Sequence, residues 1–305
     1  MHVTLRQLTV FRAVASLGGF TRAANELGLT QPAVSLQVKQ LEDQLGLALF
    51  ERGGRKLELT AAGARVLETT QAVDAQLSTL EQSLAQLKGG VSGHLVIAGV
   101  TTTKYVAPHL LGAFLRRYPL VTPKLTVTNR QNVLRRLKER QDDLVLMGRV
   151  PNSIAVDAHP FVSNPLVLAA PRDHPMASRK EIMPEQLAQL PMLMREPGSG
   201  TRLAVEEFLR ARGVVANVVM ELGSGEAIKQ AVIAGLGISV LSLHSLRLEL
   251  AAGLVKLLPV EGFPLEKHWY AVVPHGKQLR PVAQTFLDFL ATDGAELLKA
   301  SAVSR

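Results

Sequence analysis

The spacing of apolar residues in positions 1–59 predicts three short helices followed by a small hairpin. In the first helix an apolar residue recurs every three positions, at Leu5, Leu8, Phe11 and Val14, which gives this helix one buried face. Gly18 ends it, and Thr21 is placed to cap the second helix. Gly28 supplies the left-handed backbone of a tight turn, and Thr30 is placed to cap the third helix.

The third helix has an apolar seam on one side and short polar groups on the other. The seam advances in steps of four, three and four residues, through Val34, Val38, Leu41 and Leu45. Beyond it, Leu49-Phe50 and the alternating run Leu57-Glu58-Leu59 flank a glycine-centred basic loop at 52–56, which predicts a hairpin. Three helices with a tight turn and a hairpin describe a winged helix-turn-helix, a DNA-binding fold.

The outward face of the third helix carries residue types that contact DNA. If the seam faces inward, the helical period of about 100° per residue turns Ser35, Leu36 and Lys39 outward. Gln31 at the helix tip can pair with adenine, Leu36 suits a thymine methyl group, and Lys39 suits a phosphate. The candidate DNA-binding residues are Thr21, Gln31, Pro32, Ser35, Leu36, Lys39 and, in the basic loop, Arg52 and Arg55. Each is also an ordinary surface residue, so plain solubility is the alternative.

Residues 60–88 predict one long helix, with Thr60 placed to cap it. Its apolar positions keep heptad spacing, at Val66, Val73, Leu77, Leu80, Leu84 and Leu87. At 1.5 Å per residue this helix is a rod of roughly 43 Å. Because no neighbouring segment is large enough to cover the stripe, we expect two copies of the chain to pair along it. The alternative is a helix packed against its own domain.

Residues 91–305 alternate short apolar runs with helical patterns, which predicts an α/β domain with parallel strands. The predicted strands are 95–100, 124–128, 144–147, 166–170, 192–194, 218–222, 238–241 and 270–273, and the predicted helices are 106–117, 129–140, 201–212, 226–234 and 280–290. This length suits two lobes, with crossovers at 156–165 and near 262–267. We therefore expect three parts: 1–59 for DNA, 60–90 as linker helix, and 91–305 for an effector, with lobe I at about 91–161 and 268–305 and lobe II at about 162–267.

Ligands of two-lobed α/β domains bind at the carboxyl ends of strands, beside helix N-termini. A run of three threonines and the stretch 196–202, which contains Gly198 and Gly200, each follow a predicted strand and precede a helix. Backbone N–H groups there favour an anion. The candidate effector-binding residues are Thr101, Thr102, Thr103, Asn129, Gly148, Ser199, Thr201 and Arg202. Helix capping is the alternative for the hydroxyl and amide side chains, and a structural ion pair is the alternative for Arg202.

Composition narrows the class of protein further. The 305 residues carry 34 Lys+Arg against 26 Asp+Glu, a net charge of +8. Residues 1–90 contribute only +1 of it, so basic charge alone is weak evidence for DNA binding. With no cysteine, disulfides and thiolate metal sites are excluded. The N-terminus has no signal-peptide pattern and no apolar run reaches about 18 residues, so we expect a cytoplasmic protein.

Two other function classes compete with a DNA-binding regulator. The eight histidines show no metal-ligand spacing and Gly198-Ser199-Gly200 is not a nucleophile elbow, so we expect neither an enzyme, nor a metal site, nor a cofactor. A solute-binding protein without a DNA role would suit residues 91–305 alone. The N-terminal 88 residues argue against it.

Five ordered motifs resemble the LysR-type transcriptional regulators: residues 11–15 (FRAVA), 20–24 (FTRAA), 31–42 (QPAVSLQVKQLE), 49–52 (LFER) and 59–63 (LTAAG). The resemblance implies a winged helix-turn-helix, a linker helix and a two-lobed effector domain like a periplasmic binding protein. It implies a dimer or dimer of dimers on inverted-repeat promoter sites, with RNA polymerase as a partner. Leu36 stands where the family commonly has Arg, and Ser242 where it commonly has Pro.

The threonine run and the loop at 196–202 look most like the LysR-type subgroup that controls Calvin-cycle carbon-fixation genes. That likeness implies a phosphorylated or carboxylated metabolite as the effector.

Overall fold

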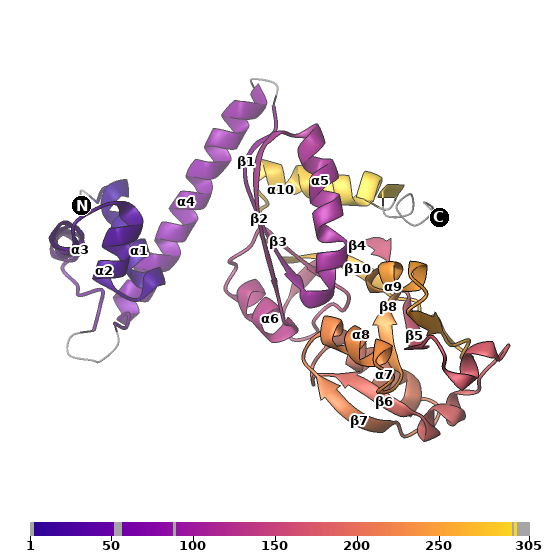
Figure 1. The fold of residues 1–305 in the computed structure, drawn as a ribbon. Coiled ribbons are helices and arrows are strands. Elements are labelled where there is room, and N and C mark those ends of the chain that lie inside the picture. The colour runs from indigo at the N-terminus through magenta and orange to yellow at the C-terminus, as the bar shows by residue number, and fades with distance from the viewer. Residues whose placement is uncertain (1–2, 52–56, 88–89, 295, 298–305) are drawn as a thin grey trace. The chain divides into compact units, whose positions relative to one another are not determined.

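The computed structural model describes residues 3–51, 57–87, 90–294 and 296–297 of the chain. The chain divides into two compact units, Met1–Glu81 and Gln82–Arg305. Figure 1 shows the helical elements α1 to α3 at the start of the chain and the mixed α/β elements that follow α4. In the described residues, no helix is both long enough and apolar enough to cross a membrane.

The first unit is a helix-turn-helix closed by the start of a hairpin. Its elements are α1 (Leu5–Leu17), α2 (Phe20–Leu27), α3 (Gln31–Leu45) and the long helix α4 (Ala61–Leu87), which continues past the unit boundary. The predicted seam of α3 is buried at Val34, Val38 and Leu41, against Val10 and Phe11 of α1. An antiparallel bridge between Phe50 and Leu59 holds the base of the hairpin.

Helix capping in this unit follows the sequence at two predicted positions and differs at a third. The Thr30 hydroxyl accepts a hydrogen bond from the Ala33 N–H, and the Thr60 hydroxyl accepts one from Gly63, so both predicted caps are present. Thr21 was the third predicted cap, and this prediction is wrong. Helix α2 already begins at Phe20, after Gly19, so Thr21 lies inside its first turn with an exposed side chain.

The first turns of helix α4 pack against the first unit, and leucines farther along the helix are exposed to solvent. Val66 and Leu67 pack against the core of the first unit, and Arg12 of α1 pairs with Asp74 at 2.9 Å. The heptad leucines farther along are exposed, Leu77 by 39%, Leu80 by 55% and Leu84 by 50%. The second half of the predicted stripe is therefore exposed at Leu77, Leu80 and Leu84.

The second unit contains two lobes, each built on a sheet. The first lobe comprises β1 (Ser92–Val100), the 3-10 turn η1 (Thr101–Tyr105), α5 (Ala107–Arg117), β2 (Leu120–Thr128), α6 (Arg130–Lys138), β3 (Leu144–Met147), β4 (Val156–Ser163), β10 (His268–Pro274), α10 (Pro281–Phe289) and η5 (Leu290–Gly294). Its strand order is β2-β1-β3-β10-β4. Because side chains alternate along a strand, Leu95 and Ile97 of β1 pack with α5 and α10, whereas Ala98 packs with α6. Both faces of the sheet are thereby covered.

The second lobe repeats this layering. It comprises β5 (Leu166–Pro171), η2 (Pro175–Ser178), η3 (Pro184–Gln189), β6 (Pro191–Arg195), α7 (Gly200–Arg210), β7 (Asn217–Leu222), α8 (Gly225–Ile233), β8 (Ser239–Ser242), η4 (Leu243–Ser245), α9 (Arg247–Ala251) and β9 (Val255–Leu257). The sheet orders are β8-β5-β9 and β6-β7, joined by a bridge from Met192 to Ile238. Leu168 faces α7 and the adjacent Ala169 faces α8.

The α/β class and the expected parallel strands are confirmed, and antiparallel pairs, which the pattern did not predict, occur beside them. Strand β1 is parallel to β2 and β3, and β6 is parallel to β7. Strand β10 is antiparallel to β3 and β4, and β5 is antiparallel to β8 and β9. Each antiparallel pair contains β5 or β10, and each of these two strands is the first after a crossover between the lobes.

The apolar pattern of the sequence did not predict two of the strands. Residues 156–163 form β4, although the stretch 156–165 was expected to be a crossover, and 255–257 form β9. Strand β4 is an edge strand that contains Pro160 and a half-exposed polar face, so it lacks an apolar run. The crossovers themselves run side by side: the Asn164 N–H donates to the Lys267 carbonyl at 2.7 Å.

The burial of the α3 seam predicts that substitutions on the two sides of this helix differ in their effect on the stability of the first unit. Leu41 is fully buried, so Leu41→Ala should lower the free energy of unfolding by about 2–5 kcal/mol. The control is Leu36→Ala on the exposed side of the same helix, with an expected change within about 0.5 kcal/mol. Amide hydrogen exchange of α1 to α3 measures both, and equal loss of protection in the two variants would contradict the observed burial.

Candidate DNA-binding face and effector cleft

The face of α3 opposite its seam is exposed, as the helical period predicts. Gln31, Pro32, Ser35, Leu36 and Lys39 are all exposed. Leu36 has 54% of its surface exposed, which is unusual for a leucine on an otherwise polar face. The structure thus brings these five candidates together on one helix. Arg52 and Arg55 of the basic loop lie outside the described residues.

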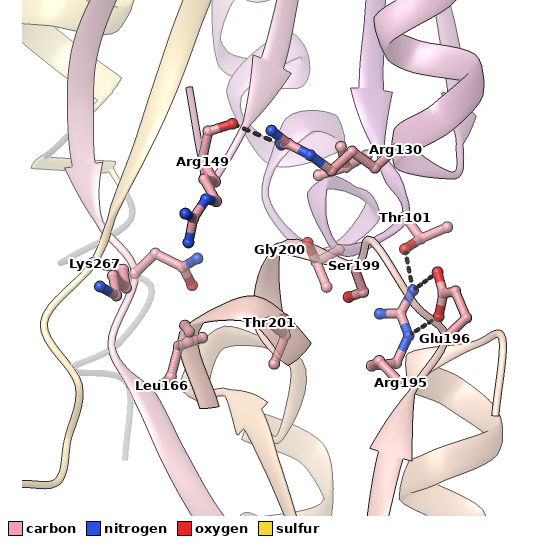
Figure 2. A pocket seen from close by; sticks show the side chains of 15 residues that line it. Thr101, Arg130, Arg149, Leu166, Arg195, Glu196, Ser199, Gly200, Thr201 and Lys267 are labelled. Carbon is pink, nitrogen blue, oxygen red and sulfur yellow. Dashed lines mark hydrogen bonds and ion pairs between the residues drawn. The ribbon is translucent and has the colours of Figure 1, made fainter. Parts of the chain in front are cut away.

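A cleft between the two lobes of the second unit encloses about 660 Å³ outside the protein atoms, part of it open to solvent. The first lobe contributes residues that follow β1, β2 and β3, and the second contributes the loop after β6 and the start of α7. Figure 2 shows the lining side chains. The cleft therefore lies at the carboxyl ends of strands, where the sequence placed it.

The start of α7 forms the floor of the cleft. Ser199, Gly200 and Thr201 line it, and the first N–H groups of any helix have no intrahelical acceptor. Ser199 is buried at the N-cap position, and its hydroxyl makes no capping hydrogen bond. The helix dipole adds partial positive charge at the same place. This floor is suited to an anionic group.

One wall of the cleft is formed by a buried arginine that is paired within its own lobe and bonded to the other lobe. Arg195, with 5% of its surface exposed, donates two hydrogen bonds to Glu196, at 2.7 and 2.8 Å. Its Nη2 also donates to the Thr101 hydroxyl of the first lobe at 3.2 Å. Figure 2 shows this group at one side of the cleft. The guanidinium is thus held in a fixed place by partners from both lobes.

The cleft lining contains further cations. Arg149 and Lys267 line the cleft, and Arg130 donates from its Nη1 to the Arg149 carbonyl at 2.7 Å. Burial and the neighbouring Arg149 charge lower the pKa of Arg130. Arg149 pairs with Glu207 of α7 at 2.7 Å, and this hydrogen bond raises the pKa of Arg149. Among the described residues that line the cleft, four cationic side chains face one carboxylate: Arg130, Arg149, Arg195 and Lys267 against Glu196.

The structure divides the sequence-predicted effector residues into two groups. The residues Thr101, Thr102, Gly148, Ser199 and Thr201 line the cleft. Three others lie outside the lining, held by local bonds. The Thr103 hydroxyl donates to the Val100 carbonyl, Asn129 caps α6, and Arg202 pairs with Glu206 and Glu221.

Sequence reasoning missed most of the positive charge in the cleft. Arg130, Arg149, Arg195 and Lys267 were not among the candidates. Arg130 carried a readable signal, because a cation in the first turn of a helix opposes the helix dipole and so needs another reason to be there. Arg149 directly follows the predicted Gly148. Lys267 belongs to a crossover and reaches the cleft only through the packing of the lobes.

A second polar contact joins the lobes beside the cleft. The Tyr105 hydroxyl of η1 donates to Glu226 of α8 at 2.6 Å, and Lys229, which is buried, pairs with Glu226 at 3.2 Å and Glu249 at 2.6 Å. Burial and the Glu226 hydrogen bond raise the pKa of Tyr105 to about 12. Tyr105 therefore stays protonated and holds η1, which begins with the cleft residues Thr101 and Thr102, against the second lobe.

Comparisons with known proteins agree with this architecture in both units. Residues 5–64 match the bacterial regulatory helix-turn-helix protein model of the lysR family, and residues 88–295 match the LysR substrate binding domain. The chain belongs to the LysR family. It is a DNA-binding transcriptional regulator with an effector-binding domain.

Relatives of this LysR-family chain share nearly its full length. It is 49% identical over 289 residues to the HTH-type transcriptional activator CmpR of Synechocystis, covering 95% of each chain. It is 45% identical to the RuBisCO operon transcriptional regulator of Acidithiobacillus ferrooxidans, covering 97% of this chain and 96% of that one. A solved structure, the Synechocystis PCC6803 CcmR regulatory domain in complex with 2-PG, is 43% identical, with a TM-score of 0.64 over 67% of this chain and 98% of that domain.

The family assignment bears on the competing function classes. The relatives are transcriptional regulators rather than enzymes or solute-binding proteins. Within the residues that the structure describes, no cluster of three His, Asp or Glu side chains is arranged to hold a metal ion.

The Tyr105 contact predicts a measurable loss of stability when it is removed from this LysR-family chain. Tyr105→Phe removes a charge-assisted hydrogen bond and should lower the free energy of unfolding of the second unit by about 1–2 kcal/mol. Urea unfolding followed by the fluorescence of Trp269, the chain's only tryptophan, measures it. Tyr118→Phe is the control, because the described residues show no hydrogen bond from the Tyr118 hydroxyl. Equal losses in both variants would mean that the Glu226 contact adds no stability.

The same contact predicts how this loss depends on pH. The Tyr105 hydrogen bond is the largest influence on Glu226 and lowers its pKa. A carboxyl with a lowered folded pKa adds stability above its ordinary pKa, here 4.5, and loses it as the pH falls through the folded value. The difference between the wild-type chain and Tyr105→Phe should therefore be full at pH 7 and narrow below about pH 4.5. A difference that widens with acid would contradict this assignment.

Proposed function

We propose that this chain regulates carbon-fixation genes and that its interlobe cleft binds a small phosphorylated acid such as 2-phosphoglycolate. The observation that carries the proposal is the lining of the cleft, which contains four cations, one carboxylate and the start of α7. The relatives support the same reading, since two are named as a RuBisCO operon regulator and as CmpR, and a related domain binds 2-PG. An anion with two or more negative charges fits this charge balance best.

The α3 face supports the role of this chain at a promoter. Gln31, Ser35 and Leu36 are exposed together at the first turns of α3, where a helix in the major groove reaches base edges. Thr21 is exposed in the first turn of the preceding helix, α2, and can contact the phosphate backbone of DNA. Arg52 and Arg55 complete the proposed set, as contacts to the minor groove or to phosphates.

The exposed stripe of α4 supports assembly into a homo-oligomer. Leu77, Leu80 and Leu84 would be covered by the same stripe of a second copy, which would bring two α3 helices onto an inverted repeat. Effector binding would favour one arrangement of the lobes, and so of the assembly, over another. That change would recruit or release RNA polymerase at the promoter.

Leu36 tests the DNA-binding proposal. Leu36→Ala removes an apolar contact to a thymine methyl group, so affinity for a specific promoter site should fall about five- to tenfold, while affinity for random duplex stays within about a factor of two. Gel-shift titrations at one fixed salt concentration measure both. If both affinities fall equally, Leu36 contacts no base.

Lys267 tests the effector proposal. Lys267→Gln should weaken the binding of 2-phosphoglycolate to the full chain about tenfold, because the variant removes a cation from the cleft lining. Lys256→Gln is the matched control, since Lys256 is exposed on β9 of the same lobe and does not line the cleft. Isothermal titration calorimetry measures the affinities. Equal weakening by both variants, or no binding by the wild-type chain, would contradict the proposal.

A further inference from the structure

Two of the three arginines that line the cleft are already paired with a carboxylate, in very different ways. Arg195 is buried, and Glu196, with 26% of its side chain exposed, holds it by two hydrogen bonds. Arg149 and Glu207 are far more exposed, with 36% and 47% of their side chains accessible. One pair is therefore fixed within the structure, and the other lies at the solvent-exposed rim.

The Arg149 pair also crosses between the lobes. Arg149 follows β3 and Gly148 in the first lobe, and Glu207 lies on α7 of the second. Arg149 lines the cleft while Glu207 does not. A ligand in the cleft can therefore reach Arg149. The Glu207 carboxylate, which lies outside the cleft lining, neutralises the Arg149 charge.

The two carboxylates differ in what their release would cost. Freeing Glu196 would leave the buried Arg195 charge without its main partner, which is strongly unfavourable. Freeing Glu207 would return a half-exposed carboxylate to water and hand Arg149 to another anion, so little electrostatic energy would be lost. Of the two, only the Glu207 pair is suited to exchange.

We infer that Glu207 is an internal competitor for the effector: it neutralises Arg149 when the cleft is empty and is displaced when a ligand anion takes its place. The inference rests on the proposed function, because it concerns the same cleft and the same anionic ligand. Glu207 then sets how strongly a ligand must be charged to bind. A phosphorylated acid displaces the carboxylate, whereas a weakly charged analogue of similar size competes poorly.

This inference also gives the ligand a part in lobe closure. In the structure the lobes are joined at this rim by Arg149 and Glu207 directly. In the occupied cleft the ligand would connect Arg149 to the start of α7, which lies in the second lobe. One interlobe contact is exchanged for another that exists only with ligand bound, which is a requirement for an effector to shift a conformational equilibrium.

The test is Glu207→Gln in the full chain, with 2-phosphoglycolate titrated by calorimetry. Removing a competitor should tighten binding about two- to fivefold, the range expected for a partly exposed ion pair. A purely structural Glu207, which oriented Arg149 for the ligand, would give weaker binding instead. The direction of the change therefore separates the two roles.

Glu206→Gln is the matched control. Glu206 is the adjacent carboxylate on α7 and pairs with Arg202 at 2.7 Å, away from the cleft lining. It removes the same charge from the same helix, so its affinity should stay within about a factor of 1.5 of the wild type. In an Arg149→Gln background, Glu207→Gln should change the affinity by no more than the same factor, because its target is gone.

The outcomes separate this inference from the proposed function. Unchanged or weaker binding by Glu207→Gln, equal tightening by Glu206→Gln, or tightening that persists without Arg149 would each overturn the competitor role and leave the proposed effector in place. No binding by the wild-type chain or by any variant would overturn the proposed function, and the competitor role with it.

Discussion

The buried guanidinium of Arg195 is the group on which the effector cleft depends. It stands at the end of β6, where the chain turns toward α7, and it bonds to Glu196 in its own lobe and to Thr101 in the other. A buried cation must satisfy its hydrogen bonds or destabilise the fold. Satisfying this one requires the threonine run after β1 and the loop after β6 to approach each other. The same approach creates the cleft.

The electrostatics of the cleft follow from this arrangement. Arg195 is committed to fixed partners, and Arg130, Arg149 and Lys267 supply the other positive charges of the cleft lining. Burial and the neighbouring Arg149 charge lower the pKa of Arg130, because both disfavour its charged form. The lobes are therefore joined at two places along the cleft, by the bond from Arg195 to Thr101 and by the Arg149–Glu207 ion pair.

The two units illustrate different ways of using an exposed apolar residue. Leu36 on α3 is a single exposed leucine on a polar face, which suits contact with a base methyl group. Leu77, Leu80 and Leu84 on α4 repeat along one helix, which suits a second copy of that helix. Spacing along the helix, more than exposure itself, separates the two interpretations.

The sequence by itself determined most of the local helices and strands. Residues 31–45 have one apolar seam, and 166–170 are apolar on both faces, so each pattern has one low-energy arrangement whatever surrounds it. Gly28 ends α2 and Thr30 caps α3, and both effects involve only residues close by in the chain. The carboxyl-end rule placed Thr101, Gly148 and Thr201 at the cleft for the same reason: it depends on strand direction alone.

The tertiary structure alone decided which strands pair across the lobes and which charges meet. Strand β4 is an edge strand without an apolar run, and its antiparallel partner β10 lies more than a hundred residues later, so no local pattern could reveal the pair. Lys267 and Arg149 reach the same cleft from a crossover and a strand end. Ion pairs such as Arg149–Glu207 join residues far apart in the chain, because Coulomb attraction acts through space and leaves no periodicity in the sequence.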